Sequence, residues 1–217
     1  MNDLFENERT GDREILGEQA FVLRGFALPF VNGLLAEIAE IKEVSPFRHM
    51  ITPGGLTMSV GLTNCGTVGW ISDRRGYRYT EIDPITRNRW PQMPELFRSL
   101  ARSAASAAGF ENFVPDACLV NQYQPGTKLS LHQDKDELDL YAPIVSVSLG
   151  IPAIFQFGGF ERNSMKVNIG LFHGDVVVWG GVDRLRYHGV STIKQNMHSM
   201  LGERRINLTF RKVMPKK

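Results

Sequence analysis

The sequence predicts an α+β fold, mainly β, in which two helices pack on one side of a double-sheet barrel or jelly roll. Two early segments have the apolar spacing of amphipathic helices. Most other segments are short runs rich in β-branched and aromatic residues, separated by turn-forming residues. Early helices followed by many strands favour helices on one face of β-sheets over an alternating βα arrangement.

The helices are predicted from apolar residues that recur three or four positions apart. This spacing runs from Val31 to Ile41 and places a helix over residues 29–43. The helix should end before Pro46, because the residue preceding a proline is biased away from helical backbone. A second helix is expected over 94–109, where a proline opens the segment and a glycine can cap its end.

The strands should be short and bounded by turns. They are expected over residues 21–26, 58–63, 117–123, 144–149, 153–157, 175–179 and 205–211. Turns such as Thr52-Pro53-Gly54-Gly55 and Gly180-Gly181 separate them. There is no internal repeat, so we expect a single domain over 1–217, with residues 1–18 loosely ordered.

Composition is that of an ordinary globular protein with little net charge. Of the 217 residues, 42% are hydrophobic and 22% charged, and the net charge is +2, which fits one domain with a real core. Cys65 and Cys118 are too few for a disulfide scaffold or zinc site and fit a reducing cytosol. The N-terminus lacks the apolar core of a signal peptide, and no run approaches the roughly 18 apolar residues of a membrane helix. We therefore expect a cytoplasmic, monomeric protein without membrane association.

Residues 65–92 form a long connection that combines aromatic residues with arginines. The aromatic residues are Trp70, Tyr77, Tyr79 and Trp90, and the arginines are Arg74, Arg75, Arg78, Arg87 and Arg89. A connection this long in a compact domain is more often functional than idle. From charge alone, a solvated arginine-rich loop is the simpler interpretation.

Two histidines and an aspartate suggest a metal site. His132 and Asp134 are two residues apart, so on an extended backbone their side chains point to the same face. His188 could supply a third ligand, which would complete the two-histidine, one-carboxylate set of non-haem iron(II) oxygenases. Taken alone, the His-x-Asp pattern is weak, and a hydrogen-bonded surface histidine is the default interpretation. Three further histidines receive no role in a site: His49, His173 and His198.

Strict alternation marks the segment 205–211. Its apolar residues face one way, and its polar residues Arg205, Asn207, Thr209 and Arg211 face the other. A solvated edge strand would show the same pattern. Two arginines on one face would also suit an anionic ligand, because a guanidinium binds carboxylates in bidentate fashion. A second alternating segment, 119–123, adds Asn121 and Tyr123 as neutral hydrogen-bond partners, so the two strands could line the mouth of a barrel.

Six motifs follow one another along the chain. They are Asn121-Gln122-Tyr123, residues 129–136, residues 146–150, His173-Gly174-Asp175, His188-Gly189 and residues 205–211. In this order and spacing they resemble the AlkB family of iron(II)- and 2-oxoglutarate-dependent dioxygenases. With Pro53-Gly54-Gly55 and residues 69–77, the resemblance extends over about 45–211. An ordered set of motifs is far more specific than any one of them.

The resemblance implies a double-stranded β-helix (jelly-roll) core over 115–211 and a nucleotide-recognition lid within 45–92. It implies iron(II) on His132, Asp134 and His188, and 2-oxoglutarate on the iron. The distal carboxylate of 2-oxoglutarate would be bound by Arg205 with Tyr123 beside it. Arg211 would approach the iron-bound end as a catalytic-site residue, with Asn121 and Asn207 nearby. The implied substrate-binding residues are Trp70, Tyr77 and Tyr79 in the lid, and Asp136 and Arg162 facing the flipped base.

The activity that the resemblance implies is oxidative dealkylation of N-alkylated bases such as 1-methyladenine and 3-methylcytosine. It would use O2 and 2-oxoglutarate and release succinate, CO2 and an aldehyde, which is direct-reversal repair of DNA, with RNA as a further substrate option. The target base must be flipped out or single-stranded, because the reacting carbon is inaccessible in a stacked duplex. Single- and double-stranded forms of the partner nucleic acid both stay open.

Two other classes of function remain open at this point. An oxygenase of a protein side chain or small molecule is disfavoured by the aromatic residues set among arginines, because stacking and phosphate contacts suit a nucleic acid. A non-catalytic jelly-roll binding module is disfavoured by the complete set of metal ligands and by both arginines of residues 205–211.

Overall fold

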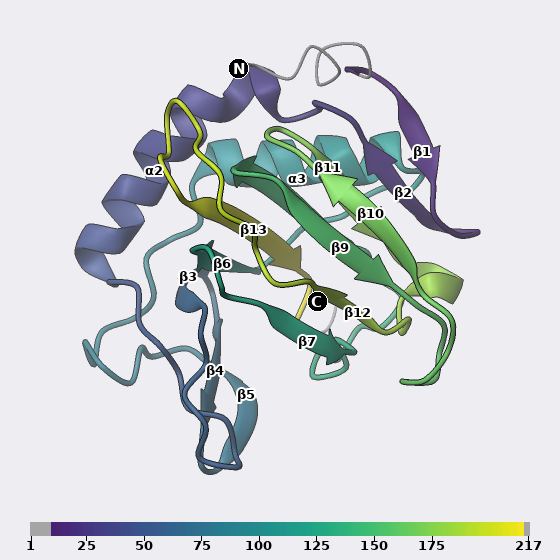
Figure 1. Ribbon diagram of the computed structural model, residues 1–217. Helices are drawn as coiled ribbons and strands as arrows, with labels where there is room; N and C mark the ends of the chain where they lie inside the picture. Colours follow the sequence, from purple (N-terminus) through teal and green to yellow (C-terminus); the bar gives the residue numbers. More distant parts are fainter. Residues whose placement is uncertain (1–9, 215–217) are drawn as a thin grey trace.

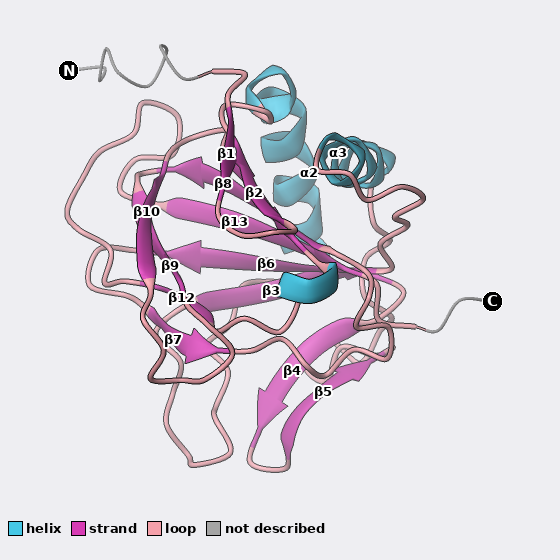
Figure 2. Cartoon of the chain, turned by 90° about the vertical axis from the view of Figure 1, so that its right-hand side faces the viewer, coloured by secondary structure: helices cyan, strands magenta, loops and turns pink. Residues whose placement is uncertain are grey.

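Two antiparallel sheets lie face to face in the computed structural model, which describes residues 10–214 (Figure 1). In spatial order, the larger sheet contains β1 (Arg13–Ile15), β2 (Ala20–Leu23), β11 (Val176–Trp179), β8 (Ile144–Gly150), β13 (Arg205–Arg211), β6 (Ala117–Tyr123) and β3 (Gly61–Gly66). The smaller sheet contains β10 (Val167–Leu171), β9 (Ala153–Phe157), β12 (His188–Val190) and β7 (Leu129–His132). Figure 2 shows the layers edge-on, with both helices on the outer side of the larger sheet. The predicted mainly-β jelly roll with helices packed on one sheet is confirmed.

The two predicted helices form close to their expected bounds. Helix α2 (Val31–Val44) follows a short 3-10 turn, η1 (Leu28–Phe30), and its apolar stripe is buried. Helix α3 (Glu95–Ala107) starts after Pro94. It is followed by Gly109, whose φ of +91° is a backbone conformation that glycine adopts without strain.

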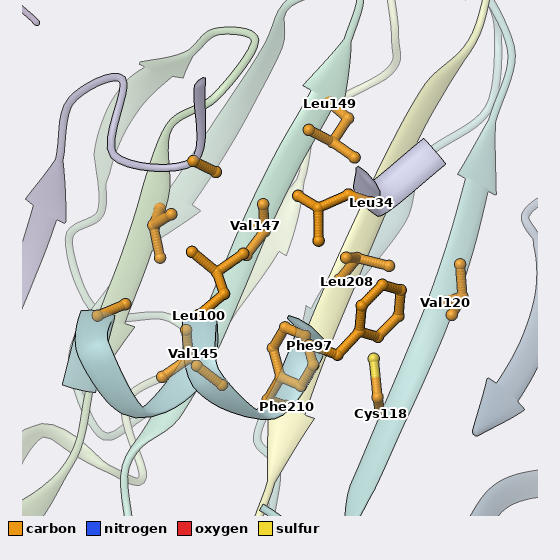
Figure 3. Close-up of a cluster of buried hydrophobic side chains, with 14 of the residues drawn as sticks. Leu34, Phe97, Leu100, Cys118, Val120, Val145, Val147, Leu149, Leu208 and Phe210 are labelled. Atoms are coloured by element: carbon orange, nitrogen blue, oxygen red, sulfur yellow. The ribbon is translucent and has the colours of Figure 1, made fainter. Parts of the chain in front are cut away.

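The main core lies between the helices and the outer face of the larger sheet. Figure 3 shows Phe97 of α3 beside Phe210 of β13, and their rings meet edge to face with centroids 5.8 Å apart. Each fully buried side chain of this kind stabilises the fold by about 1.5–3 kcal/mol. Because the apolar residues of β13 face these helices, the polar residues of the same strand must point between the two sheets.

The connection expected over residues 65–92 contains regular structure that the prediction missed. Strands β4 (Gly69–Asp73) and β5 (Gly76–Thr80) pair as an antiparallel hairpin. Figure 1 shows this hairpin projecting from one end of the sheets. Asp73 pairs with Gly76 at the ends of the strands, and the turn between them is Arg74-Arg75. The glycines and charged residues among the aromatic ones weakened the strand signal.

The N-terminal expectation was wrong in part. We expected loose order throughout 1–18, yet β1 pairs with β2 at the edge of the larger sheet. Residues 1–9 lie outside the described part of the chain, so the expectation stays a prediction there. Within residues 10–214, no helix combines the length and hydrophobicity needed to cross a membrane.

Candidate active site

The space between the two sheets is lined by the polar face of β13. Arg205, Asn207, Thr209 and Arg211 are all buried, with side chains on the face opposite the helices. Strand β13 pairs with β8 on one side and β6 on the other, so it is central in its sheet. The alternative of a solvated edge strand is therefore wrong, because buried polar groups must find partners inside the protein or in a ligand.

The structure brings His132, Asp134 and His188 together. His132 of β7 and His188 of β12 are directly opposite each other in the smaller sheet, and their ring centroids are 4.4 Å apart. Asp134 follows the end of β7. Its Oδ1 lies 3.6 Å from Nε2 of His132, and its Oδ2 lies 3.7 Å from Nε2 of His188. Candidate ligand atoms of all three residues fall within 4.8 Å of one another, which suits the facial ligand set of an iron(II) oxygenase.

The same local contact orients both imidazole rings. Nδ1 of His132 lies 2.9 Å from the carbonyl oxygen of Ser130, and Nδ1 of His188 lies 3.0 Å from that of Arg186. A carbonyl oxygen can only accept a hydrogen bond, so each Nδ1 carries the proton and each Nε2 offers its lone pair toward Asp134. Burial, reinforced by the nearby His132, lowers the pKa of His188 to about 3. This ring is therefore neutral, as a metal ligand must be.

Arg211 holds the carboxylate of Asp134. Its Nε and Nη2 donate to Oδ2 of Asp134 at 3.0 and 2.7 Å. Burial by itself would raise the pKa of the Asp134 carboxyl, but the Arg211 guanidinium is the main influence that holds it below its ordinary value. Burial would likewise lower the pKa of Arg211, and the nearby Asp134 carboxylate is the main influence that raises it instead. Asp134 is thus ionised and ready to bind a cation.

Arg205 lies fully buried farther along the same strand face. Its Nη2 donates to Oγ of Ser148 at 3.0 Å, and its guanidinium carbon lies 4.9 Å from the ring centroid of Tyr123. Its Nε and Nη1 are buried without a hydrogen-bond partner in residues 10–214. Buried donors that lack partners are costly, and a carboxylate is the acceptor that a guanidinium fork fits best. The residues present therefore fit a dicarboxylate such as 2-oxoglutarate.

Burial also shifts the titration of both members of this pair. Desolvation lowers the pKa of Arg205, with Tyr123 opposing the shift. Desolvation raises the pKa of Tyr123, with Arg205 opposing that shift. Tyr123 consequently stays a neutral phenol beside the guanidinium.

Asn207 lies between the two arginines on β13 and forms a buried hydrogen-bond network of its own. Its Nδ2 donates to Oγ of Ser146 at 2.8 Å and to the carbonyl oxygen of Val147 at 2.9 Å. Its Oδ1 accepts from Thr209 at 2.9 Å and from Asn121 at 3.4 Å. Ser146, like Ser148 beside Arg205, was not predicted as a site residue. The alternation of serines with valines in β8 is the signal that could have found both.

The three aromatic residues predicted for the lid share one face of the β4–β5 hairpin. Trp70 and Tyr79 are directly opposite in register, and the rings of Trp70 and Tyr77 stack with centroids 5.6 Å apart at 14°. This face meets the chain after Asp134. Nε1 of Trp70 donates to Asp136 at 3.4 Å, and the hydroxyl of Tyr79 donates to Glu137 at 2.5 Å.

Several arginines of this region are paired within it. Arg78 donates to both carboxylate oxygens of Asp73 at 2.9 and 2.6 Å, and Arg89 lies 3.2 Å from Glu81. The hydrogen bond from Arg78 is the main cause that lowers the pKa of Asp73. Within residues 10–214, Arg74 and Arg87 have no ion-pair partner. The arginine-rich segment is therefore partly a set of local pairs.

Within residues 10–214, Arg162 makes no hydrogen bond or ion pair with the other predicted site residues. It is exposed on the connection between β9 and β10. There it lines a surface cavity of about 440 Å³ together with Lys128, Ser130, Gln156 and Thr192. Sequence reasoning also missed Glu137 and Arg184, which form a buried ion pair at 2.9 Å next to the site.

Comparison with known proteins agrees with this geometry. Residues 20–211 match the family model of the 2OG-Fe(II) oxygenase superfamily. The chain is 56% identical to the alpha-ketoglutarate-dependent dioxygenase AlkB of Salmonella typhimurium over 100% of both chains. It is 54% identical to that of Escherichia coli over 97% of each.

More distant relatives extend the comparison. The chain is 31% identical to the human nucleic acid dioxygenase ALKBH1, over 56% of this chain and 31% of that one. It is 28% identical to the solved structure of OsALKBH1, with a TM-score of 0.80, over 93% of this chain and 100% of that one.

Proposed function

The chain belongs to the AlkB family within the 2OG-Fe(II) oxygenase superfamily, and from this premise we propose that it removes alkyl groups oxidatively from nucleic-acid bases. It is an iron(II)- and 2-oxoglutarate-dependent dioxygenase with O2 as co-substrate. The alternative of a non-catalytic binding module is excluded by this membership. The proposal concerns the substrate and the roles of individual residues.

Iron(II), when bound, supplies the oxidising chemistry that converts 2-oxoglutarate and O2 into succinate and CO2 while an alkyl carbon is hydroxylated. His132, Asp134 and His188 would hold the metal. The backbone contacts of the two rings keep their Nε2 atoms available without further rearrangement. Arg211 would keep Asp134 ionised and oriented.

The two arginines of β13 would contact opposite ends of 2-oxoglutarate. Arg205, with its buried and unpartnered Nε and Nη1, would bind the distal carboxylate beside Tyr123. Arg211 lies at the metal end of the strand, and the buried amides of Asn121 and Asn207 lie between the two arginines. Binding along the strand would place the reactive end of the co-substrate next to the metal ligands.

The observation that carries the nucleic-acid proposal is the stacked pair of Trp70 and Tyr77 above the loop that follows Asp134. A base has a flat π-face that such a pair can stack on. Lys128 and Arg162, at one surface cavity, have no ion-pair partner in residues 10–214 and could contact phosphates. These features favour a nucleic acid over a peptide or a small metabolite.

The finer substrate assignment is 1-methyladenine and 3-methylcytosine in DNA or RNA. Both bases are cationic at neutral pH, and Asp136 lies where a base under Trp70 would meet it. Hydroxylation of the methyl carbon on a ring nitrogen gives an unstable product that loses formaldehyde and restores the base. The chain would therefore act in direct reversal of alkylation damage.

Succinate formation with different substrates tests the proposal. The protein loaded with iron(II) should produce succinate faster with methylated oligonucleotides than with unmethylated oligonucleotides, peptides or free metabolites. A His132→Ala protein, measured in parallel, controls for non-enzymatic decarboxylation. Stimulation by a peptide or metabolite, with none by a methylated oligonucleotide, would overturn the nucleic-acid assignment and leave the oxygenase class intact.

A further inference from the structure

Three successive residues after the 3-10 turn η2 (Gly181–Asp183) contact two of the metal ligands and the residue between His132 and Asp134. Arg184 donates from Nη1 to the carbonyl oxygen of Asp134 at 2.6 Å. The carbonyl oxygen of Leu185 accepts from Nε2 of Gln133, which lies between the first two ligands, at 2.6 Å. The carbonyl oxygen of Arg186 accepts from Nδ1 of His188. This segment thus touches the chain on both sides of the site.

The side chain of Arg184 donates three hydrogen bonds, and all three are to the loop formed by residues 134–142. Its side chain is only 2% exposed. Besides Asp134, its Nε donates to the carbonyl oxygen of Ala142 at 3.1 Å, and its Nη2 donates to Oε2 of Glu137 at 2.9 Å. Residues 134–142 contain no helix or strand, so no sheet hydrogen bonds fix the backbone of Asp134. Arg184 holds this loop at its start, middle and end.

Glu137 extends the same contacts to the lid. Its Oε2 binds Arg184, while its Oε1 accepts from Tyr79 of β5 and lies 3.4 Å from Nε of Arg211. The side chain of Glu137 is 2% exposed. A buried carboxylate that loses its ion-pair partner is strongly destabilising. Loss of Arg184 would therefore release both the backbone of Asp134 and the side chain of Glu137.

We propose that Arg184 is a positioning residue of the metal site, which fixes Asp134 for metal binding by holding residues 134–142. It does not touch the carboxylate of Asp134 and acts through the backbone and through Glu137. A loop ordered before the metal arrives loses little conformational entropy on binding, whereas a loop freed by substitution must be ordered at that moment. The inference concerns the metal site alone and does not depend on a nucleic-acid substrate.

Metal affinity of the full chain, measured without 2-oxoglutarate or nucleic acid, tests this role. Mn(II) serves as the probe because it binds oxygen and imidazole ligands and avoids the oxidation of iron(II) by air. Arg184→Met removes all three contacts at similar side-chain length, and Arg184→Lys keeps the charge but not the planar fork. Arg24→Met is the matched control. Arg24 is also buried, with ion pairs to Asp175 and Glu14 and a bond to the carbonyl oxygen of Gly170, away from the ligands.

Arg184→Met should weaken Mn(II) binding by roughly ten- to hundredfold, the range for residues that support metal ligands. Hydrogen exchange of the metal-free protein should speed up over residues 134–142. Arg24→Met should lower the melting temperature while leaving Mn(II) affinity within about twofold of the wild type. The lysine variant should lie between the methionine variant and the wild type in Mn(II) affinity.

Unchanged Mn(II) affinity in a folded Arg184→Met protein would overturn the proposal and leave Arg184 a packing residue. Equal losses of affinity in Arg184→Met and Arg24→Met would overturn it as well, because general destabilisation would then explain both. If Arg184→Met does not fold, Arg184→Lys decides. Weaker Mn(II) binding with normal folding supports the role, and wild-type affinity rejects it.

Discussion

The metal ligands together with Arg205 and Arg211 of β13, which we call the ligand frame, differ in exposure from the lid hairpin β4–β5. The ligand frame is largely shielded from solvent, whereas several side chains of the hairpin are exposed. In the ligand frame, Arg205 and Arg211 are buried between the two sheets, and the side chain of Asp134 is only 10% exposed. Arg211 pairs with Asp134, whereas Arg205 has two buried donors that a ligand could satisfy. In the lid, the side chain of Arg75 is 83% exposed and Tyr77 is 50% exposed. The two regions meet where Trp70 and Tyr79 contact the loop after Asp134, and where Ile71 packs in the same apolar cluster as Tyr123.

The difference separates the demands of chemistry from those of recognition. A metal and its co-substrate need fixed donors in a site that excludes water, because interactions between charges are stronger away from water. A large substrate needs accessible rings and cations that can adapt to it. Substitutions in the ligand frame should therefore abolish succinate formation or change its dependence on 2-oxoglutarate. Substitutions in the lid should change only the turnover and binding of the nucleic acid.

The largest effect is expected from a metal ligand. Asp134→Ala should reduce succinate formation to background, because the three-residue ligand set loses its carboxylate and Arg211 keeps only the longer contact to Glu137 within residues 10–214. Residues that merely support ligands contribute about ten- to hundredfold in metal affinity, so loss of a ligand should exceed that range. Anaerobic iron(II) titration together with succinate assays checks both parts. Normal iron stoichiometry with normal succinate production would reject the metal assignment.

Arg205 should show a large effect confined to the co-substrate. A charge-assisted hydrogen bond contributes about 1.5–3 kcal/mol, so Arg205→Ala should raise the 2-oxoglutarate requirement by roughly ten- to hundredfold. Metal affinity should persist, because Arg205 contacts none of the three ligands. Arg204→Ala is the matched control, since Arg204 is the neighbouring arginine but is exposed. An unchanged co-substrate requirement combined with loss of iron would identify Arg205 as structural.

Sequence patterns predicted the ligand frame better than the strands and side chains that hold it in place. The ranges of β6, β9 and β13 matched to the residue, because alternation over five or more residues leaves little ambiguity. Strands β7 and β12 were missed, since they are short and their pairing joins segments far apart in the chain. Glu137 was not predicted as a site residue. Its burial depends on Arg184, and no local pattern shows a contact between residues so distant in sequence.

In the lid, Trp70 should affect nucleic-acid turnover and spare the core chemistry. Stacking on a base contributes about 1–3 kcal/mol, so Trp70→Ala should reduce kcat/KM for a methylated oligonucleotide from several-fold to roughly a hundredfold. Decarboxylation of 2-oxoglutarate without substrate should stay near the wild-type rate. Trp70→Phe keeps a ring but removes the donor to Asp136, and it should recover most of the loss if stacking dominates. A fully active Trp70→Ala protein would break the distinction between the two regions.

Binding of the oligonucleotide should also weaken as salt is added, because phosphate contacts release condensed counterions. Arg74 and Arg87, which have no ion-pair partner in residues 10–214, are the lid residues best placed to contribute. Charge-neutral substitution of each should flatten the dependence of affinity on salt, with Arg89→Gln as a control because Arg89 is already paired with Glu81. Binding that does not respond to salt would remove the phosphate contacts from the proposal.

The smallest effect is predicted for Asp136, which lies where the two regions meet. Its substitution should change the preference between cationic and neutral methylated bases. Its carboxylate accepts from Nε1 of Trp70 at 3.4 Å, so a base stacked against Trp70 would lie beside it and shield it from water. Methylation at N1 of adenine leaves the ring cationic at neutral pH, whereas 1-methylguanine is neutral, and only the cation gains from a nearby negative charge. Asp136→Asn keeps the shape and the acceptor but removes the charge. It should lower kcat/KM for 1-methyladenine by on the order of tenfold, about 1.4 kcal/mol, and change 1-methylguanine much less. Rates of both oligonucleotides measured side by side with both proteins decide the point, because equal losses on the two lesions would mean that Asp136 supports the lid through Trp70 and does not sense the charge of the base.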